Sequence, residues 1–383
     1  MRFYLRDLTL VLLAAGSSSR FELDIKKQWL RIDHEPLWYF VAKRLQNTQL
    51  FKEVIITSSL EDIEFMKTYG NFTYIAGGNT RQQSLKNSLE KVTTKHVLVS
   101  DIARACIADD FLEEILSFKS DSDCLVPYLH VNDTIVYDDK TIDRTKVKRI
   151  QTPQLSKTSA LRLALNTDEE FTDESSAIVA NGGSREFILG DEDAHKITYI
   201  DDLNKIPCLS APSSDVLSGN GFDVHAFDTK GEMFLGGVKI ESDFGFKAHS
   251  DGDVAIHSLI DALLGASGMG DIGMMFPDND DKYKGIDSKK LLRLVVQKLH
   301  HYGFTIINID ITIAAQQPRI GKYKSQMREV LSKILNCDQQ RVNIKATTTE
   351  KLGFIGRSEG VGVIANANLK YYDWQTKKKD RRT

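Results

Sequence analysis

The sequence predicts an α/β protein of two domains, in which a mostly parallel sheet with helices on both faces is followed by an α+β sandwich. The chain has 383 residues, which is more than one hydrophobic core usually supports. Short apolar strands alternate with helical patterns from residue 8 to about residue 205, and a stretch rich in proline and serine follows. We therefore expect domains at 1–205 and 216–383, joined by a linker at 206–215.

Five short apolar runs predict buried strands in the first domain. They lie at 10–13, 54–57, 73–75, 96–99 and 124–126, with helical patterns between most of them, such as 37–45 and 63–69. Strands and helices that alternate in this way build βαβ units on a parallel sheet.

The second domain has longer elements. Amphipathic patterns predict helices at 254–266, 287–302 and 322–336, and strands are predicted at 221–225, 305–315, 341–348 and 361–370. This order is typical of a sheet that carries its helices on one face.

The composition is that of an ordinary globular protein, 41% hydrophobic and 27% charged, with a net charge of −3. It gives no reason to expect a nucleic-acid or membrane partner. The short apolar run 8–15 enters a glycine turn, unlike a signal peptide, and the basic residues 377–382 are expected to be solvated. Cysteines that lie far apart predict free thiols in a reducing cytoplasm. They are Cys106, Cys124, Cys208 and Cys337.

A strand and a helix of the second domain carry residue types that bind metals. Asp223 and His225 are two residues apart on the strand, so their side chains face the same way. Asp253, His257 and Asp261 recur every four residues and are expected on one face of the helix.

Asp223, His225 and His257 together offer one carboxylate and two imidazoles. Zinc with three protein ligands keeps a fourth position open, which is the catalytic pattern. A single buried histidine is more often only hydrogen-bonded. On these residues alone, the two interpretations stay equally open.

The first domain has a possible phosphate site. The strand 10–13 runs into a glycine turn at Gly16, where backbone N–H groups can cradle phosphate, and the cations Arg20 and Lys27 follow. Asp101 follows the fourth strand, in a position to hold Mg²⁺ on a nucleotide. A plain strand–helix turn and a helix N-cap at Asp101 explain the same features equally well.

Motifs along residues 8–205 carry a resemblance to a known family. They are Ala-Ala-Gly-x-x-x-Arg20, Lys27-Gln28, Gly77-Gly78-x-x-Arg81, Asp101-x-Ala-Arg104, Asp133-Thr134, Asp143-Arg144, Thr152-Pro153-Gln154, Thr172-Asp173-Glu174 and Lys196-Ile-Thr198. This half resembles 2-C-methyl-D-erythritol 4-phosphate cytidylyltransferase. The resemblance implies a Rossmann-like nucleotidyltransferase sheet that transfers CMP from CTP to a sugar-alcohol phosphate and releases pyrophosphate.

The resemblance also implies residue roles in this half. Arg20 and Lys27 would be catalytic and would stabilise charge on the α-phosphate, and Asp101 would face Mg²⁺ or Mn²⁺. The cytidine would be surrounded by Ala14, Ala15, Gly16, Gly78 and Ser84. Substrate would also contact Arg104, Thr134, Arg144, Lys196 and Thr198, some of them across a dimer interface. Departures from the family pattern, at Ser17 or Ser18, Gln83, Ser100 and Ala105, leave the fit around the base open.

A second set of motifs covers about 218–372. They are Gly221-Phe-Asp-Val-His-Ala-Phe227, His249-Ser-Asp-Gly-Asp-Val-Ala-x-His257, Asp261-Ala-Leu-Leu-Gly265-Ala266, Gly270-Asp-Ile-Gly-x-x-Phe276-Pro-Asp278 and Lys345-Ala-Thr-Thr-Thr-Glu-Lys-Leu-Gly-Phe354-x-Gly-Arg357. This half resembles 2-C-methyl-D-erythritol 2,4-cyclodiphosphate synthase, which implies an α+β sandwich of the cyclodiphosphate synthase type.

By this second resemblance, zinc would sit on Asp223, His225 and His257. His249 and Thr348 would be catalytic, Ser250 would help to orient a phosphate, and Glu350 would hold Mg²⁺ or Mn²⁺. The remaining substrate contacts would be Asp271, Ile272, Gly273, Phe276, Asp278, Ala314, Arg319, Ala346, Thr347, Phe354 and Arg357. Arg319 stands where the family often has lysine. Without the resemblance, Glu350 is better explained as a solvated charge and Asp278 as a turn residue.

Together the two resemblances imply a fused enzyme with two non-consecutive activities of the methylerythritol phosphate route to isoprenoid precursors. Its partners would be CTP, methylerythritol 4-phosphate and CDP-methylerythritol 2-phosphate, and no kinase motif for the intervening step is visible. A trimeric second half and a dimeric first half would be satisfied together by a hexamer. The alternatives are a first half that is only a scaffold or nucleotide-binding module, and a second half that is an unrelated zinc phosphohydrolase.

Overall fold

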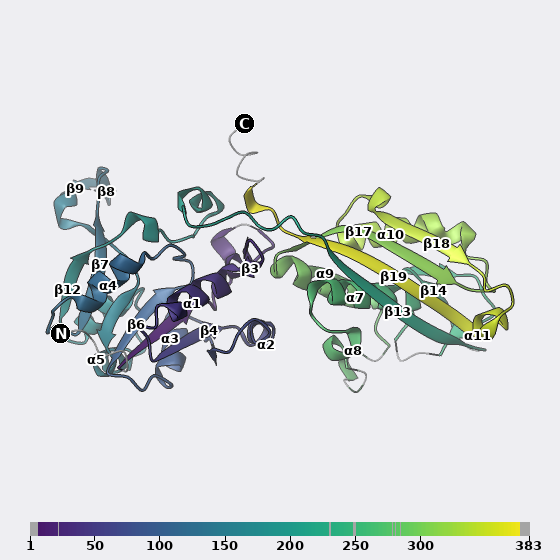
Figure 1. Cartoon of the computed structure of the whole chain (residues 1–383), viewed down its shortest axis with the longest axis horizontal. Helices are drawn as coiled ribbons and strands as arrows, with labels where there is room; N and C mark the ends of the chain where they lie inside the picture. The colour runs from purple at the N-terminus through teal and green to yellow at the C-terminus, as the bar shows by residue number, and fades with distance from the viewer. Residues whose placement is uncertain are drawn as a thin grey trace. The chain divides into compact units, whose positions relative to one another are not determined.

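The computed structural model describes residues 7–375, apart from 22, 230, 248–249, 278, 280 and 284. The chain divides into two compact units (Figure 1). One comprises Met1–Ala211 with Asp373–Thr383, and the other comprises Pro212–Tyr372. Among the described residues, no helix is long and apolar enough to cross a membrane.

The first unit is built on a mixed sheet with a parallel centre. The strands β6 (His96–Asp101), β1 (Leu8–Leu13), β4 (Glu53–Ser58) and β5 (Thr73–Ala76) lie in this order and run parallel. Beyond β6, the antiparallel strand β11 (Gln154–Lys157) separates it from β7 (Cys124–His130). β7 also pairs with β10 (Lys148–Ile150) and β12 (Arg185–Leu189). The five predicted strands are confirmed, and β10, β11 and β12 were not predicted because their polar residues hide the apolar pattern.

Helices connect these strands. They are α1 (Leu37–Asn47), α2 (Leu60–Met66), α3 (Arg81–Leu89), α4 (Asp109–Ser117), α5 (Thr158–Ala164) and α6 (Glu174–Ala180). The predicted helix at 63–69 begins three residues earlier, because Ser59 caps it by accepting a hydrogen bond from the Asp62 N–H. Short strand pairs β2 (Arg31–Ile32) with β3 (Glu35–Pro36) and β8 (Ile135–Tyr137) with β9 (Lys140–Ile142) complete the unit.

A residue from the far end of the sequence completes the core of this unit. Trp374 is fully buried, and its indole Nε1–H donates to the Arg31 carbonyl oxygen at 2.8 Å. The chain thus leaves the first unit at Ala211 and returns to it at Asp373.

Two of the cysteines were wrongly predicted to be free thiols. Cys106, in the loop after β6, and Cys208 form a disulfide, with Cα atoms 5.7 Å apart. A separation of 102 residues along the chain gives no hint of this pairing, because only the fold brings the two loops together. Cys124 and Cys337 are free, as expected.

The second unit is an α+β sandwich (Figure 1). Its sheet has the order β16 (Gly245–Phe246), β13 (Leu217–Asp228), β19 (Gly360–Tyr371), β17 (Phe304–Ala314) and β18 (Val342–Thr347). β13, β19 and β17 are antiparallel neighbours, and β18 runs parallel to β17. The predicted helices are present as α7 (Val254–Ser267), α9 (Ser288–His301) and α10 (Lys324–Leu335). Smaller elements are α8 (Ile272–Met275), α11 (Gly353–Gly356), β14 (Met233–Leu235) and β15 (Val238–Ile240).

Two glycines on β13 let α7 lie directly on the sheet. A Cβ atom at Gly219 would stand 2.1 Å from the Ala262 carbonyl oxygen, and one at Gly221 would stand 1.9 Å from the Ser258 carbonyl oxygen. Any larger residue would push the helix away. This close approach places the first turn of α7 beside the residues that follow Gly221 on β13.

The face of the sheet that α7 does not cover is partly apolar. On β19, Val361, Val363 and Ala365 are fully buried, whereas Ile364 between them is 44% exposed. On β13, Phe222 is 61% exposed. Because side chains alternate along a strand, these exposed residues share the face opposite to the helices.

Candidate active sites

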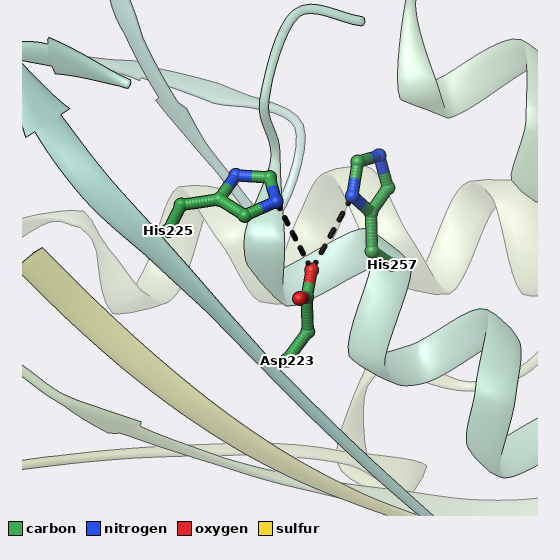
Figure 2. Close-up of side chains that lie close together, drawn as sticks. All are labelled: Asp223, His225 and His257. Atoms are coloured by element: carbon green, nitrogen blue, oxygen red, sulfur yellow. Dashed lines mark ion pairs between the residues drawn. The ribbon is translucent and has the colours of Figure 1, made fainter. Parts of the chain in front are cut away.

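The three residues expected to bind metal converge in the second unit. Asp223 and His225 point to the same side of β13, and His257 reaches toward them from α7 (Figure 2). The Asp223 Oδ2 atom lies 3.3 Å from His225 Nε2 and 3.4 Å from His257 Nδ1. One ligand atom from each residue falls within 4.8 Å of the others. This cluster is the arrangement that the i, i+2 spacing and the helix predicted.

The electrostatics of the cluster follow from its partial burial. Burial alone would raise the pKa of Asp223, but hydrogen bonds and charges from His225 and His257 hold that pKa well below its usual range. Burial opposes the charge on His225, yet its pKa is raised because it faces Asp223 and the Gly252 carbonyl. Two imidazoles thus converge on a carboxylate that stays ionised, and this donor set fits a divalent cation.

Contacts behind the cluster orient both imidazoles. The His225 Nδ1–H donates to the Gly252 carbonyl oxygen at 2.9 Å, which leaves Nε2 facing Asp223. His257 Nε2 lies 2.9 Å from the Ser288 hydroxyl and 3.2 Å from the Ser250 hydroxyl, so Nδ1 faces Asp223.

Asp253 and Asp261, which were expected on the same helix face as His257 but not as metal ligands, have structural roles. Asp253 is fully buried at the N-cap of α7, where it accepts hydrogen bonds from the backbone N–H groups of Gly236, Gly237 and Ile256. Its carboxylate is used for capping, a role that has the same sequence spacing as a ligand.

Asp261 supports a neighbouring predicted contact instead. Its carboxylate accepts the Ile272 N–H at 2.8 Å, and Asp271 caps α8 by accepting the Met274 N–H. The start of α8, with Asp271, Ile272 and Gly273, is therefore held at the end of α7's polar face. Phe276, which follows α8, is buried.

The remaining predicted contacts of this unit fall on β17, β18 and the loops that follow. Ala314 pairs with Thr347 in the β17–β18 register, and Ala346 precedes Thr347. Thr348 donates from its hydroxyl to Glu350 at 2.9 Å. Arg319, Phe354 and Arg357 are exposed, and Arg357 forms an ion pair with Glu359. His249 and Asp278 lie outside the described residues.

In the first unit, a cavity of about 370 Å³ opens at the carboxyl ends of β1 and β6. Ligands bind at this edge of parallel sheets. The predicted site residues that line it are Ala14, Ala15, Gly16, Arg20, Lys27, Gly78, Ser84, Asp101 and Lys196. Arg81 also lines the cavity, so the lining combines backbone of the glycine turn with four cations and one carboxylate.

A chain of ion pairs runs along one side of this cavity. Asp101 contacts Lys196 Nζ at 2.7 Å and Arg81 Nε at 3.1 Å. Arg81 Nη1 in turn contacts the fully buried Glu174 at 2.6 Å. Arg81 and Glu174 both lie in motifs of the first half, but no role was predicted for either residue. Asp101 is thus paired with cations and is not a helix N-cap.

The charges in the cavity shift the pKa values of its groups. Burial works against the ionised form of Asp101, but Arg81 and Lys196 hold its pKa well below the usual range. Burial, together with the nearby charge of Lys196, lowers the pKa of Lys27 to about 8. A bound anion would favour the charged form of Lys27 and raise its pKa again. The cavity therefore favours a polyanionic ligand.

Four predicted contacts of this unit do not line the cavity. Arg104 is buried beside it and donates to the Thr152 hydroxyl at 2.8 Å and to the Ala194 carbonyl at 2.6 Å. Thr198 donates its N–H to Asp202. Thr134 and Arg144 are exposed at the β8–β9 hairpin, because that hairpin projects from the sheet.

The cationic cavity on an α/β sheet and the carboxylate–imidazole cluster on an α+β sandwich define a two-domain enzyme of phosphate chemistry. A model of the 2-C-methyl-D-erythritol 4-phosphate cytidylyltransferase family matches residues 8–208. A model of the YgbB family matches residues 216–370.

Whole-chain relatives agree with both matches. A protein of Sulfurimonas denitrificans named bifunctional enzyme IspD/IspF is 72% identical over 97% of this chain and 96% of its own length. The protein of that name from Aliarcobacter butzleri is 54% identical over 96% of this chain and 99% of its own. The solved structure of the bifunctional IspDF from Campylobacter jejuni has a TM-score of 0.89 and 45% identity, over 96% of this chain and 99% of that one.

The chain belongs to the bifunctional IspD/IspF enzymes. It combines cytidylyltransferase and cyclodiphosphate synthase activities of the methylerythritol phosphate pathway to isoprenoids.

Proposed function

We propose that the first unit transfers CMP from CTP to 2-C-methyl-D-erythritol 4-phosphate in the cavity at the ends of β1 and β6, and releases pyrophosphate. The observation that carries this assignment is the convergence of Arg20, Lys27 and Lys196 on one cavity beside the glycine turn. Phosphoryl transfer requires positioning and neutralisation of charge more than covalent chemistry. Three cations at the cavity wall supply that neutralisation.

Within this cavity, Arg20 and Lys27 face the α-phosphate and stabilise the charge that develops on it. The backbone of Ala14, Ala15 and Gly16, with Gly78 and Ser84, surrounds the cytidine. Lys196 is the contact for methylerythritol phosphate that lines the cavity; in the structure it is paired with Asp101 at 2.7 Å. Asp101 is the carboxylate that would hold Mg²⁺ or Mn²⁺ with the nucleotide.

Thr134, Arg144 and Thr198 are also assigned to the methylerythritol phosphate, and Arg104 is assigned to substrate binding. None of the four lines the cavity of a single chain. For Thr134 and Arg144, which flank the β8–β9 hairpin, a part in binding requires movement of the hairpin or a second copy of this unit. The exposed position of Thr134 and Arg144 on the β8–β9 hairpin supports the second copy.

The second unit is proposed to cyclise CDP-methylerythritol 2-phosphate and release CMP. Asp223, His225 and His257 would hold zinc, which as a Lewis acid polarises a phosphate oxygen. His249 and Ser250 orient the terminal phosphate, and Thr348 stabilises the transition state. Asp271, Ile272 and Gly273 bind the erythritol hydroxyls at the start of α8.

Other groups are assigned to the nucleotide part of this second substrate. Glu350, which already accepts a hydrogen bond from Thr348, would hold a second divalent ion, Mg²⁺ or Mn²⁺. Ala314, Arg319, Ala346 and Thr347 surround the cytidine and its phosphates, and Arg357 contacts phosphate. Phe276, Asp278 and Phe354 are assigned to substrate binding without a stated part of the substrate. The adjacency of Ala314 and Thr347 in the sheet register supports this grouping.

We also infer a cytoplasmic homo-oligomer whose domains are divided near residues 206–215. The uncovered apolar sheet face with Phe222, Val224 and Ile364 supports self-association of the second unit. Trimer contacts there and dimer contacts in the first unit would close a hexamer. The cytoplasmic location is inferred from the proposed substrate, since CTP is abundant in the cytoplasm.

The test is to assay both reactions on the intact, metal-replete chain. CTP, methylerythritol 4-phosphate and Mg²⁺ should yield pyrophosphate and CDP-methylerythritol, and CDP-methylerythritol 2-phosphate should yield the cyclic diphosphate. Lys27→Ala should abolish only the first reaction and Asp223→Asn only the second, so each variant is the folding control of the other. Failure of the wild-type chain to release pyrophosphate would make the first unit a binding or assembly module. Hydrolysis in place of cyclisation would make the second a phosphohydrolase.

A further inference from the structure

A buried serine and a carboxylate stand behind the imidazole of His257. Ser288, at the first position of α9, is fully buried, and its hydroxyl oxygen lies 2.9 Å from His257 Nε2. The same hydroxyl donates to Asp251 Oδ1, and the Ser288 backbone N–H donates to Asp251 Oδ2 at 3.1 Å. Asp251 thus accepts hydrogen bonds from Ser288 with both carboxylate oxygens.

The donor count of this group decides the direction of its hydrogen bonds. A serine hydroxyl has one proton to donate, and an ionised carboxylate can only accept. Because the Ser288 proton goes to Asp251, the Ser288 oxygen must accept from His257, so Nε2 carries the proton. The neutral imidazole then has its lone pair on Nδ1, the nitrogen that lies 3.4 Å from Asp223 in the metal cluster.

The second hydroxyl near His257 Nε2 is consistent with this direction. Ser250 lies 3.2 Å from Nε2 and accepts the Gly252 N–H at 3.1 Å. The other imidazole of the cluster, that of His225, is held by a different contact, the Gly252 carbonyl oxygen at its Nδ1. In its neutral, metal-binding form each imidazole therefore has its own partner for the ring proton, and the lone pair is left on the nitrogen that faces the cluster.

We propose that Asp251 and Ser288 are positioning residues that set the tautomer and the orientation of His257 for metal binding. Neither belongs to the three-residue ligand cluster, and they act on metal binding through His257. This inference rests on the proposed zinc site. Outer contacts of this kind typically change metal affinity by about 10–100-fold.

The test measures zinc affinity by competition with a chromophoric chelator, using the full-length chain. Ser288→Ala removes the acceptor, and Asp251→Asn gives the hydroxyl an amide donor, so that Ser288 can donate to Nε2 and favour the wrong tautomer. Both variants should bind zinc about 10–100-fold more weakly than wild type. Ser332→Ala is the matched control, since Ser332 is buried in α10 and its hydroxyl donates only to the Glu329 carbonyl among the contacts described; it should bind zinc as wild type does.

Two further readouts separate positioning from a structural role. Thermal unfolding of the metal-free chain should change by a similar amount in Ser288→Ala and Ser332→Ala, and pyrophosphate release by the first unit should be unchanged. If Ser288→Ala and Asp251→Asn bind zinc like wild type, the inference is overturned while the zinc site stands. If the wild-type chain binds zinc no better than Asp223→Asn, the zinc site itself is wrong. Should one of the two variants fail to fold, the other still decides the question.

Discussion

Lys27 gives the first unit a pH dependence that an ordinary lysine would not give. Burial and the charge of Lys196 lower its pKa to about 8, so the free enzyme loses this cation on the alkaline side of neutrality. An unperturbed lysine titrates near 10.4 and stays charged through pH 9. Because the charge is needed to receive the triphosphate, kcat/KM for CTP should fall as the pH rises through about 8.

The size of the fall follows from the titration. A group with a pKa of about 8 is roughly half charged at pH 8 and roughly one-eleventh charged at pH 9, so kcat/KM should drop about fivefold between these values. The phosphates of both substrates are already ionised in this range. kcat should fall less, since kcat/KM reports the free enzyme and kcat the complex, in which the bound anion keeps Lys27 protonated.

The assay is pyrophosphate release at subsaturating CTP between pH 7 and 9.5. In Lys27→Arg the guanidinium stays charged, so the decline should disappear whatever the absolute rate. Lys26→Arg is the matched control: the neighbouring Lys26 pairs with Asp62 at 3.0 Å, and its replacement should leave the profile as in wild type. A wild-type profile that is flat to pH 9.5, or a Lys27→Arg profile with the same decline, would refute the reasoning.

Three other perturbations test the packing. Trp374→Ala should destabilise the first unit by about 3–5 kcal/mol in denaturant unfolding, because it empties a fully buried site and removes the hydrogen bond to Arg31; an unchanged unfolding midpoint would contradict this role. Gly221→Ala should cost about 1–3 kcal/mol and weaken zinc binding, since its Cβ would meet the Ser258 carbonyl and move α7; retained zinc affinity would show that the helix adapts. Ile364→Asp, on the uncovered sheet face, should reduce the oligomer mass in light scattering without loss of secondary structure, and an unchanged mass would place the interface elsewhere.

The sequence predicted the positions of those site residues whose placement depends on local periodicity. Asp223 and His225 share a side of β13 because side chains alternate along any strand. His257 lies on α7, whose bounds were predicted to within one residue. Asp253 marks the limit of that reasoning. The four-residue repeat placed Asp253 on the face of His257, but only the N–H groups of Gly236 and Gly237 that donate to its carboxylate show what this residue does.

The sequence by itself determined the five main strands of the first unit, the long helices and strands of the second, the cluster of three possible metal ligands and three cations of the first cavity, Arg20, Lys27 and Lys196. All of these follow from short-range patterns or from motifs. Tertiary structure alone decided the pairing of Cys106 with Cys208, the buried Glu174 that holds Arg81, and the return of Trp374 to the first unit. The partners in these contacts are 102, 93 and 343 residues apart. No local periodicity encodes contacts over such separations, because they form only when the packing of whole elements brings distant segments together.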